Sequence, residues 1–379
     1  MKVLLIDPWG IKNTNNYLNG LALGLSKNVD LTLMTNYYFQ KTTAANYVVK
    51  KIFFKKSERI KDSFFRKFIR GVEYYIGYIK ILKELKKVKY DVVHINWLLN
   101  YKQDVHFLRK IKKSFRLKIV YTAHNVLPHT NGNKRIRELN DVYSVVDRII
   151  VHGNEIKKEF SSLFPNFKDK VFVQKHGRNL NARVAFDISS IKSDIISILD
   201  SYERIYIFFG LIFYNKGVDR IINYWLKNNP KTLLIVAGKK DSEYDLFEEQ
   251  ESIARQRKNI MILDNYVDDN LLNYLIFRSD LVLLPYRHAS MSGVVFTASD
   301  FCKPVLTTDV GSISEYLEDK VDSFVVNNSD DALFDGISGS FGVSKTELAS
   351  MGQRLQANIY SICDWEKIGR YIVDDIYSY

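Results

Sequence analysis

The chain has 379 residues, of which 46% are hydrophobic and 26% are charged, and this composition excludes a largely disordered protein. Its formal net charge of +12 favours a negatively charged partner: a nucleotide, a nucleic acid or an anionic lipid. Neither of the two cysteines lies in a Cys-x-x-Cys or Cys/His cluster, which excludes a structural zinc site and a disulfide framework.

The sequence contains no hydrophobic run of the roughly 18 residues that a membrane-spanning helix needs. An acidic residue, Asp7, comes too early for a signal peptide. We therefore expect a cytoplasmic protein. Because 379 residues exceed what one hydrophobic core usually supports, we also expect two domains.

Short apolar runs alternate with longer helical patterns along the whole chain, which indicates parallel βαβ units. Strands are predicted, in chain order, at residues 3–6, 30–34, 91–95, 118–122, 148–151, 171–174, 205–209, 232–237, 260–263, 281–284, 305–307 and 323–326. The predicted fold class is α/β, with two doubly wound domains at residues 1–180 and 203–364 and a polar linker at residues 181–202. Two such sheets joined by a linker would form a cleft, with the carboxyl ends of their strands facing each other. Ligands of open α/β sheets bind at these ends.

Residues 50–90 form a basic and aromatic segment, with 14 Lys or Arg against four acidic residues. We expect two helices here, whose surface could lie on an anionic bilayer. The candidate membrane-facing residues are Lys55, Lys56, Arg66 and Lys67. The alternatives are an ordinary amphipathic helix with a solvated basic face and a surface for single-stranded nucleic acid.

Polar residues follow several predicted strands of the first half. The first strand leads into Asp7 and Gly10 and then into a polar loop that contains Asn15. This loop would contact an acceptor or a phosphate, or it would only connect the strand to the next helix, with an Asn as the helix cap. His124 and Asn125 follow the strand at 118–122, where a histidine can hydrogen-bond a sugar hydroxyl or move a proton.

His176 and Arg178 follow the last strand of the first half in the same way. Their side chains would reach the cleft, or they would only form the end of the first domain.

The second half contains candidates for binding a diphosphate. Lys216 lies in the loop after Gly210, at the start of a helix, where its ammonium group and the helix dipole would both face the anion. The stretch 290–298 leaves a strand through small residues and enters a helix, as a phosphate-binding turn does. Arg287 precedes this turn. Glu315 stands three residues after Ser312, which is the spacing of a capping box.

In this order, these residues resemble the GT-B glycosyltransferases, and among them the bacterial family 4 (group 1) enzymes of capsule and lipopolysaccharide synthesis. The resemblance covers nearly the whole chain, and the stretches that carry it are residues 121–125, 175–177, 209–217, 290–305 and 309–315. It implies two Rossmann-like domains that face a central cleft. The first would bind the acceptor and the second a nucleotide diphosphate sugar, and a helix at residues 365–379 would pack back on the first domain.

The resemblance also implies residue roles. His124 would contact the donor sugar and Lys216 the diphosphate. Leu211 stands where the family often has an Arg, and Ala289 and Thr297 stand where it has two glutamates. This pattern resembles a branch that lacks the paired glutamates. The diphosphate would then be bound by Lys216, Arg287, Ser290, Ser292, Gly293 and Val294, and the nucleotide or sugar by Gly210, Thr297 and Glu315.

The expected activity is that of a hexosyltransferase at the inner face of the cell membrane. It would move a sugar from a UDP- or GDP-linked donor to a lipid-linked oligosaccharide in capsule or O-antigen synthesis, with retention of configuration, without a metal or cofactor, and without nucleic acid as partner. If the reaction inverts, Asp7 or His124 would be the base. The alternatives are a nucleotide-sugar epimerase of the same fold and a non-catalytic module that binds membranes or nucleic acid.

Overall fold

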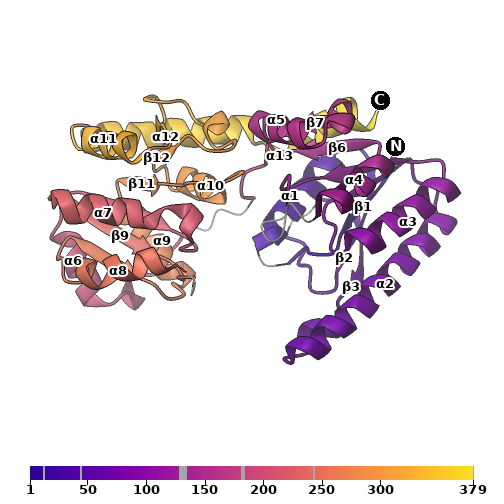
Figure 1. Ribbon diagram of the computed structural model, residues 1–379, viewed down its shortest axis with the longest axis horizontal. Coiled ribbons are helices and arrows are strands. Elements are labelled where there is room, and N and C mark those ends of the chain that lie inside the picture. The colour runs from indigo at the N-terminus through magenta and orange to yellow at the C-terminus, as the bar shows by residue number, and fades with distance from the viewer. Residues whose placement is uncertain (12, 43–44, 128–134, 181–183, 242–243, 379) are drawn as a thin grey trace. The chain divides into compact units, whose positions relative to one another are not determined.

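The computed structural model describes residues 1–11, 13–42, 45–127, 135–180, 184–241 and 244–378. The chain forms two compact units (Figure 1). Unit 1 comprises Met1–Leu180 and Cys363–Tyr379, and unit 2 comprises Asn181–Ile362. Within the described ranges, no helix combines the length and the hydropathy needed to cross a membrane.

Unit 1 is built on a seven-stranded parallel sheet with the order β3-β2-β1-β4-β5-β6-β7. The strands are β1 (Lys2–Asp7), β2 (Asp30–Asn36), β3 (Val48–Phe53), β4 (Val92–Ile95), β5 (Lys118–Thr122), β6 (Arg148–Val151) and β7 (Val171–Val173). The central strands are buried on both faces, which explains their continuous runs of Val, Ile and Leu.

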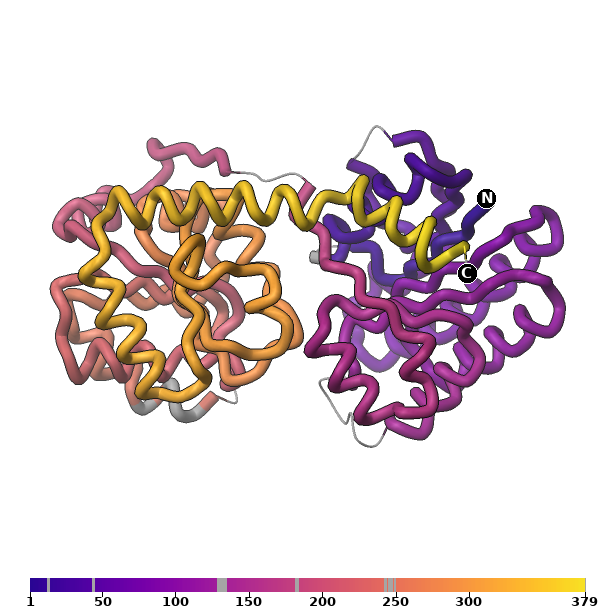
Figure 2. Tube along the Cα trace, turned by 90° about the horizontal axis from the view of Figure 1, so that it is seen from above, coloured from indigo at the N-terminus to yellow at the C-terminus, as the bar shows by residue number. Residues whose placement is uncertain are grey.

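Helices cover both faces of this sheet, and each face has its own hydrophobic core. They are α1 (Asn13–Ser26), α2 (Ser63–Lys87), α3 (Tyr101–Ser114), α4 (Ile136–Val145), α5 (Asn154–Leu163) and α13 (Trp365–Tyr371), with the short helices η1 (Ser57–Arg59), η3 (Pro165–Lys170) and η7 (Ile372–Tyr377). The C-terminal segment from α13 onward lies against the N-terminal part of unit 1 (Figure 2).

Two glycines of α1 allow α13 to approach closely. A Cβ atom on Gly20 would lie 2.0 Å from the Trp365 ring, and one on Gly24 would lie 2.0 Å from the Trp365 carbonyl oxygen. The side chains of Trp365, Ile368, Ile372 and Ile376 are therefore part of the core on this face. The last residues of the chain complete the interior of the first unit.

Unit 2 has a six-stranded parallel sheet with the order β10-β9-β8-β11-β12-β13. Its strands are β8 (Ile205–Phe209), β9 (Leu233–Ala237), β10 (Ile260–Leu263), β11 (Leu281–Leu284), β12 (Val305–Thr308) and β13 (Phe324–Val326). Its helices are α6 (Ser193–Asp200), α7 (Val218–Asn228), α8 (Asp245–Ala254), α9 (Asp269–Arg278), α10 (Gly293–Asp300), α11 (Asp330–Ser340) and α12 (Lys345–Ile362), with the short helices η4 (Ile188–Ser190), η5 (Tyr214–Lys216) and η6 (Ser314–Tyr316).

The predicted α/β class with two doubly wound parallel sheets is confirmed. Residues 181–202, which the sequence indicates as a linker, belong to unit 2 and contain η4 and α6. Of the two helices expected over residues 50–90, one is the long helix α2 and the other is only the three-residue helix η1, and the end of β3 also lies in this region. Strand β3 escaped prediction because it is a partly exposed edge strand, where lysines are tolerated and the apolar pattern is weak.

Candidate functional site

In unit 2, two loops at the carboxyl ends of adjacent strands are joined by hydrogen bonds. The main-chain oxygen of Asn215, in the loop after β8, accepts from the main-chain N–H groups of Arg287 (2.8 Å) and His288 (3.3 Å) in the loop after β11. The Asn215 side-chain amide donates to the His288 carbonyl oxygen at 3.2 Å. Gly217 has a φ of 66°, and a Cβ there would lie 2.0 Å from the Pro285 carbonyl oxygen. Only glycine allows the loops to meet this closely.

Lys216 lies at the junction of these loops. Its Nζ atom is 3.8 Å from the centroid of the Tyr286 ring. Burial lowers the pKa of Lys216 to about 8. No ion pair joins this ammonium group to a carboxylate in the described part of the chain. A desolvated cation held over an aromatic face and lacking a counter-ion is well placed to bind an anion.

The nearby start of α10 offers free main-chain donors. Ser292 is the N-cap residue, but its side chain does not cap the helix. Its hydroxyl group lies instead 3.0 Å from the Tyr286 hydroxyl group. A Cβ on Gly293 would have no atom within 4 Å, so the space in front of the first turn is open. Uncapped N–H groups and the positive end of the helix dipole favour an anion here.

A third loop, after β12, supports the turn that contains Ser290. The main-chain N–H of Ser312 donates to the Ser290 carbonyl oxygen at 3.0 Å. Gly311 has a φ of 57°, and a Cβ on it would lie 1.9 Å from the Ala289 carbonyl oxygen. The loops that follow β8, β11 and β12 therefore fix the position of the turn at residues 290–293. These three strands are adjacent in the sheet.

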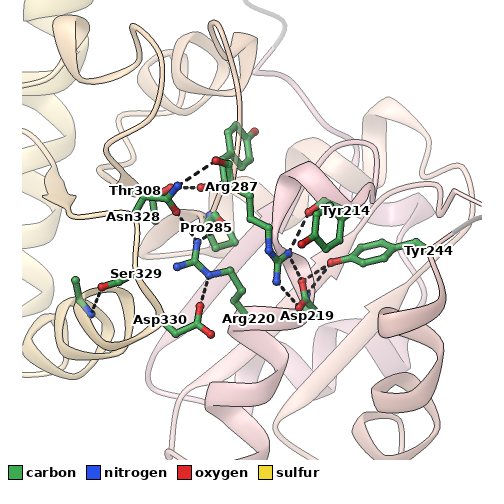
Figure 3. Close-up of polar contacts among 12 residues, drawn as sticks. Tyr214, Asp219, Arg220, Tyr244, Pro285, Arg287, Thr308, Asn328, Ser329 and Asp330 are labelled. Carbon is green, nitrogen blue, oxygen red and sulfur yellow. Dashed lines mark hydrogen bonds and ion pairs between the residues drawn. The ribbon is translucent and has the colours of Figure 1, made fainter. Parts of the chain in front are cut away.

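The predicted diphosphate ligand Arg287 is already engaged (Figure 3). Its two terminal nitrogens bond both oxygens of Asp219, at 2.7 and 2.6 Å, and one of them also donates to the Tyr214 carbonyl oxygen at 3.1 Å. Burial opposes ionisation of Asp219, but the hydrogen bonds from Arg287 and Tyr244 lower its pKa. The charge of Arg287 is thus balanced inside the protein, whereas no described carboxylate pairs with Lys216.

Three successive carbonyl groups of the loop after β11 are fixed by side chains (Figure 3). The donors are Arg220 to Pro285 (3.1 Å), Thr308 to Tyr286 (2.5 Å) and Asn328 to Arg287 (3.0 Å). The buried guanidinium of Arg220 also pairs with Asp330 at 2.6 Å and bonds Asn328 at 3.1 Å. The sequence motifs did not predict the roles of Arg220, Thr308 and Asn328. Arg220 could have been recognised, because it is an arginine on the apolar side of α7.

The capping box expected between Ser312 and Glu315 does not form. Helix η6 begins at Ser314, with Ile313 as its N-cap and no side-chain cap. The predicted nucleotide-contacting residues lie nearby: Thr297 is in α10, and Gly210 faces the start of α10, since a Cβ on Gly210 would meet the Val294 side chain at 3.9 Å.

In unit 1, polar side chains follow four adjacent strands and form a hydrogen-bonded row. Asp7 ends β1, Asn96 follows β4, His124 follows β5 and His152 follows β6, which is the order of these strands in the sheet. The contacts are Asp7 Oδ2 to Asn96 Nδ2 (2.6 Å), Asn96 Oδ1 to His124 Nε2 (3.0 Å), His124 Nδ1 to His152 Nε2 (3.1 Å) and His152 Nδ1 to the Gln174 carbonyl oxygen (3.1 Å). We call these four side chains the polar row.

Burial shifts the protonation of the polar row. It raises the pKa of Asp7 to about 6, although hydrogen bonds from Asn96, Gly10 and Trp9 oppose the shift. It lowers the pKa of His152 to about 4 and that of His124 well below its usual range. The histidines are therefore neutral near pH 7.

The other predicted residues of unit 1 lie around the polar row or support it. Gly10 donates its N–H to Asp7 Oδ1 at 2.9 Å. The His176 ring is 5.4 Å from that of His152, between ring centroids. Asn125 is half-buried in the loop after His124, and Asn15 lies in α1. Arg178 binds the C-terminal segment through its main chain, donating to Cys363 and accepting from the Trp365 indole.

Two residues of the polar row, Asn96 and His152, were not among the predicted site residues. Trp97 was also missed, and its indole ring stacks on His124 with 4.2 Å between ring centroids and 10° between planes. The rule that ligand-binding residues follow strand ends would have named all three, because they directly follow the strands predicted at 91–95 and 148–151.

A comparison with protein families indicates which family contains this arrangement of residues. Residues 192–339 match the family model described as glycosyl transferases group 1, and this stretch contains Lys216 and the turn at 290–293. This part of the chain is a group 1 glycosyltransferase region. Among curated proteins, the chain is 24% identical over 270 residues to an uncharacterized 41.2 kDa protein in the cps region of Klebsiella pneumoniae, and the match covers 67% of the chain and 70% of that protein.

Solved structures share the fold of this chain. Anabaena HepE in complex with UDP is 16% identical, with a TM-score of 0.71 and coverage of 100% of both chains. The same protein in complex with UDP-glucose is 15% identical, with a TM-score of 0.69 and coverage of 100% of both chains. A sucrose-phosphate synthase from Thermosynechococcus elongatus is 12% identical, with a TM-score of 0.69 and coverage of 98% of this chain and 97% of the other. The two parallel-sheet units are those of the GT-B fold.

Proposed function

We propose that this glycosyltransferase transfers a hexose from a uridine or guanosine diphosphate sugar and binds the donor diphosphate between Lys216 and the start of α10. The observation that carries the proposal is the Lys216 ammonium, which is partly buried and lacks a carboxylate partner within the described residues, beside an uncapped helix N-terminus. The complexes of Anabaena HepE with UDP and UDP-glucose support this class of donor.

The chemistry mainly requires stabilising the departing diphosphate, since negative charge develops on this leaving group as the sugar becomes cationic. Lys216 and the N–H groups of Gly293 and Val294 provide fixed positive charge and dipoles for that purpose. We propose that these groups do so without a metal ion. In the described part of the chain, no group of three or more His, Cys, Asp or Glu is placed to hold one.

The proposed acceptor is a lipid-linked oligosaccharide, and the proposed pathway is the synthesis of a capsule or a related surface polysaccharide such as O-antigen. The Klebsiella relative from a cps region supports the capsule assignment. We further propose that the reaction retains the anomeric configuration, with the leaving phosphate as base. Both ring nitrogens of His124 and both oxygens of Asp7 already form hydrogen bonds inside unit 1, which supports a mechanism that does not use them as the base.

Donor binding is tested by thermal denaturation of the whole protein with UDP, GDP and ADP, each at about 100 times its dissociation constant. A ligand at this concentration stabilises the folded state by ~2.7 kcal/mol, so one nucleotide should raise the melting temperature by a few degrees. The same nucleotide carrying a sugar should then be hydrolysed or transferred when an acceptor extract is added. If neither UDP nor GDP raises the melting temperature, or if only ADP does, the proposed donor class is wrong.

The beginning of α2 carries the proposed contact with an anionic membrane. Phe64, Phe65 and Phe68 expose 82%, 55% and 63% of their surface, whereas Tyr78 and Ile81, farther along the helix, are buried in the core. The helix therefore extends its first turns beyond the core and presents aromatic rings to solvent. Arg66 and Lys67 lie among these rings and are exposed. Exposed aromatic rings between basic side chains suit a bilayer with anionic headgroups.

The turn before α2 adds the other two predicted basic residues, Lys55 and Lys56. Both oxygens of the Glu73 carboxylate accept main-chain N–H groups of this turn, from Lys56 at 2.8 Å and from Ser57 at 3.0 Å. Glu58 pairs with Arg70 of α2 at 3.1 Å. The turn is thus fixed to the helix, and the four lysine and arginine side chains belong to one structural element with the three phenylalanines. Each basic side chain near an anionic surface contributes ~1 kcal/mol.

Replacing Phe64, Phe65 and Phe68 together with serine should lower binding to phosphatidylglycerol vesicles by at least about tenfold, because the inserted apolar area is lost. Vesicle flotation measures the bound fraction. Replacing Tyr266, an exposed aromatic residue of unit 2, with serine is the matched control and should leave binding unchanged. If the triple variant floats with the vesicles as much as the wild type does, the membrane assignment is wrong. If the protein binds single-stranded nucleic acid more strongly than vesicles, this surface is instead a nucleic-acid-binding surface.

A further inference from the structure

We propose that the polar row of Asp7, Asn96, His124 and His152 shares one mobile proton, and that the position of this proton decides which ring nitrogen of His124 carries hydrogen. The proposal is based on the number of hydrogen atoms that the contacts of the polar row require. The number of hydrogens does not depend on the proposed function, but any effect of the shared proton on donor binding does.

Four contacts make up the row, at distances of 2.6, 3.0, 3.1 and 3.1 Å, and each needs one hydrogen. A neutral imidazole donates through one nitrogen and accepts through the other, and a side-chain amide has one donor end and one acceptor end. Asn96, His124 and His152 therefore supply three hydrogens. The Gln174 carbonyl at one end only accepts, and so does an ionised Asp7 at the other end. The fourth hydrogen has to be an extra proton on Asp7 or on an imidazole.

Three arrangements satisfy all four contacts, and all have the same total charge. In the first, Asp7 is a neutral acid and donates to Asn96 Oδ1, the Asn96 amide donates to His124 Nε2, and each histidine carries hydrogen on Nδ1. In the other two, Asp7 is ionised and accepts from the Asn96 amide, His124 carries hydrogen on Nε2, and either His152 or His124 is an imidazolium. Rotation of the Asn96 amide by half a turn exchanges its two ends without moving the atoms around it.

Burial favours the first arrangement, in which no group of the row is charged. The pKa of Asp7 is raised to about 6, whereas that of His152 is lowered to about 4, so Asp7 holds the proton more strongly. Among the described residues, the neighbouring titratable groups are His94, His176 and Tyr17. His94 bonds Tyr377 and Thr122, and burial lowers its pKa to about 3, as it does for His176. These two histidines are therefore neutral when Asp7 titrates.

When the pH rises through the pKa of Asp7, the row loses its fourth hydrogen. Asn96 then turns its amide group toward the carboxylate, and His124 and His152 both move their hydrogen from Nδ1 to Nε2. The contact between His152 and the Gln174 carbonyl is the one that loses its hydrogen. Asn96, His152 and Asp7 are in this sense positioning residues for His124, because they decide whether its Nε2 atom donates or accepts.

Nuclear magnetic resonance of the free full-length enzyme, labelled with ¹⁵N at histidine, tests the proposal between about pH 5 and about pH 8, a range that spans the titration of Asp7. In the wild type, we expect His124 and His152 to change from the Nδ1–H to the Nε2–H tautomer together, with a midpoint near pH 6. In Asp7→Asn, the new amide always donates to Asn96, so both histidines should stay in the Nδ1–H form over the whole range. Asp141→Asn, an exposed aspartate of the same unit, should change tautomer as the wild type does.

The proposal is wrong if His124 and His152 of the wild type keep one tautomer throughout, or if Asp7→Asn still switches. The wild-type titration decides the matter even if Asp7→Asn fails to fold. Because the measurement is made without nucleotide or acceptor, failure of the donor assignment would leave this result unaffected, and failure of the shared proton would leave nucleotide binding by unit 2 unaffected.

Discussion

Replacing Lys216 with methionine should lower kcat/KM by about 100- to 1,000-fold, the range found when one fixed group that stabilises a developing anion is removed. Methionine keeps much of the length and the apolar contact with the Tyr286 ring but removes the charge. Since the Arg287 charge is balanced by Asp219, it is not available to replace the ammonium. Steady-state kinetics with the donor found by thermal denaturation measures the effect.

Two controls separate a binding role of Lys216 from a structural one. Lys227→Met changes an exposed lysine near the end of α7 and should retain wild-type kinetics. In the wild type, affinity for the nucleoside diphosphate should fall as the pH rises above about 8, because Lys216 loses its proton there. If Lys216→Met binds the nucleoside diphosphate as tightly as the wild type, the phosphates do not lie at this residue.

Replacing Gly311 with alanine should lower the free energy of unfolding by ~2–4 kcal/mol and reduce activity by at least about 100-fold. A left-handed backbone with a φ of 57° is unfavourable for alanine, and the new methyl group would lie 1.9 Å from the Ala289 carbonyl oxygen. The loop after β11 has to move to relieve this contact, and the turn at residues 290–293 moves with it. Urea unfolding and kinetics are measured on the same preparation.

Gly339→Ala is the matched substitution at a permissive site. Gly339 lies in α11, and a Cβ there meets no atom within 4 Å. Alanine should therefore stabilise the helix by ~0.5–1 kcal/mol and leave activity unchanged. Wild-type activity in Gly311→Ala would mean that the turn at residues 290–293 does not need the position that the loop after β12 gives it.

The sequence predicts strands well where they are buried, because a strand covered on both faces is a short unbroken apolar run. Of the thirteen strands in the described part of the chain, twelve were predicted, and β3 was missed because its lysines lie at an exposed edge. Lys216 and the turn at residues 290–293 are candidates from the sequence because local spacing alone marks a loop that enters a helix.

Partnerships between distant residues could not be predicted in this way. Asp219 neutralises Arg287 across 68 positions, and Arg220 reaches Asn328 across 108. Nothing in the local sequence shows that Arg287 pairs with a carboxylate while Lys216 pairs with none among the described residues. The polar row is an intermediate case: each member follows a strand end that the sequence predicts, but the order of the strands in the sheet is needed to show that the four side chains touch.

The interior position of Trp365, Ile368, Ile372 and Ile376 has a consequence for how the protein is made. Unit 1 opens the chain, yet one of its two cores needs side chains that leave the ribosome only after the whole of unit 2 has been synthesised. Until then the groove along α1 that Gly20 and Gly24 keep open for Trp365 stays exposed and apolar. The second unit is thus able to finish folding before the first, although it is translated later.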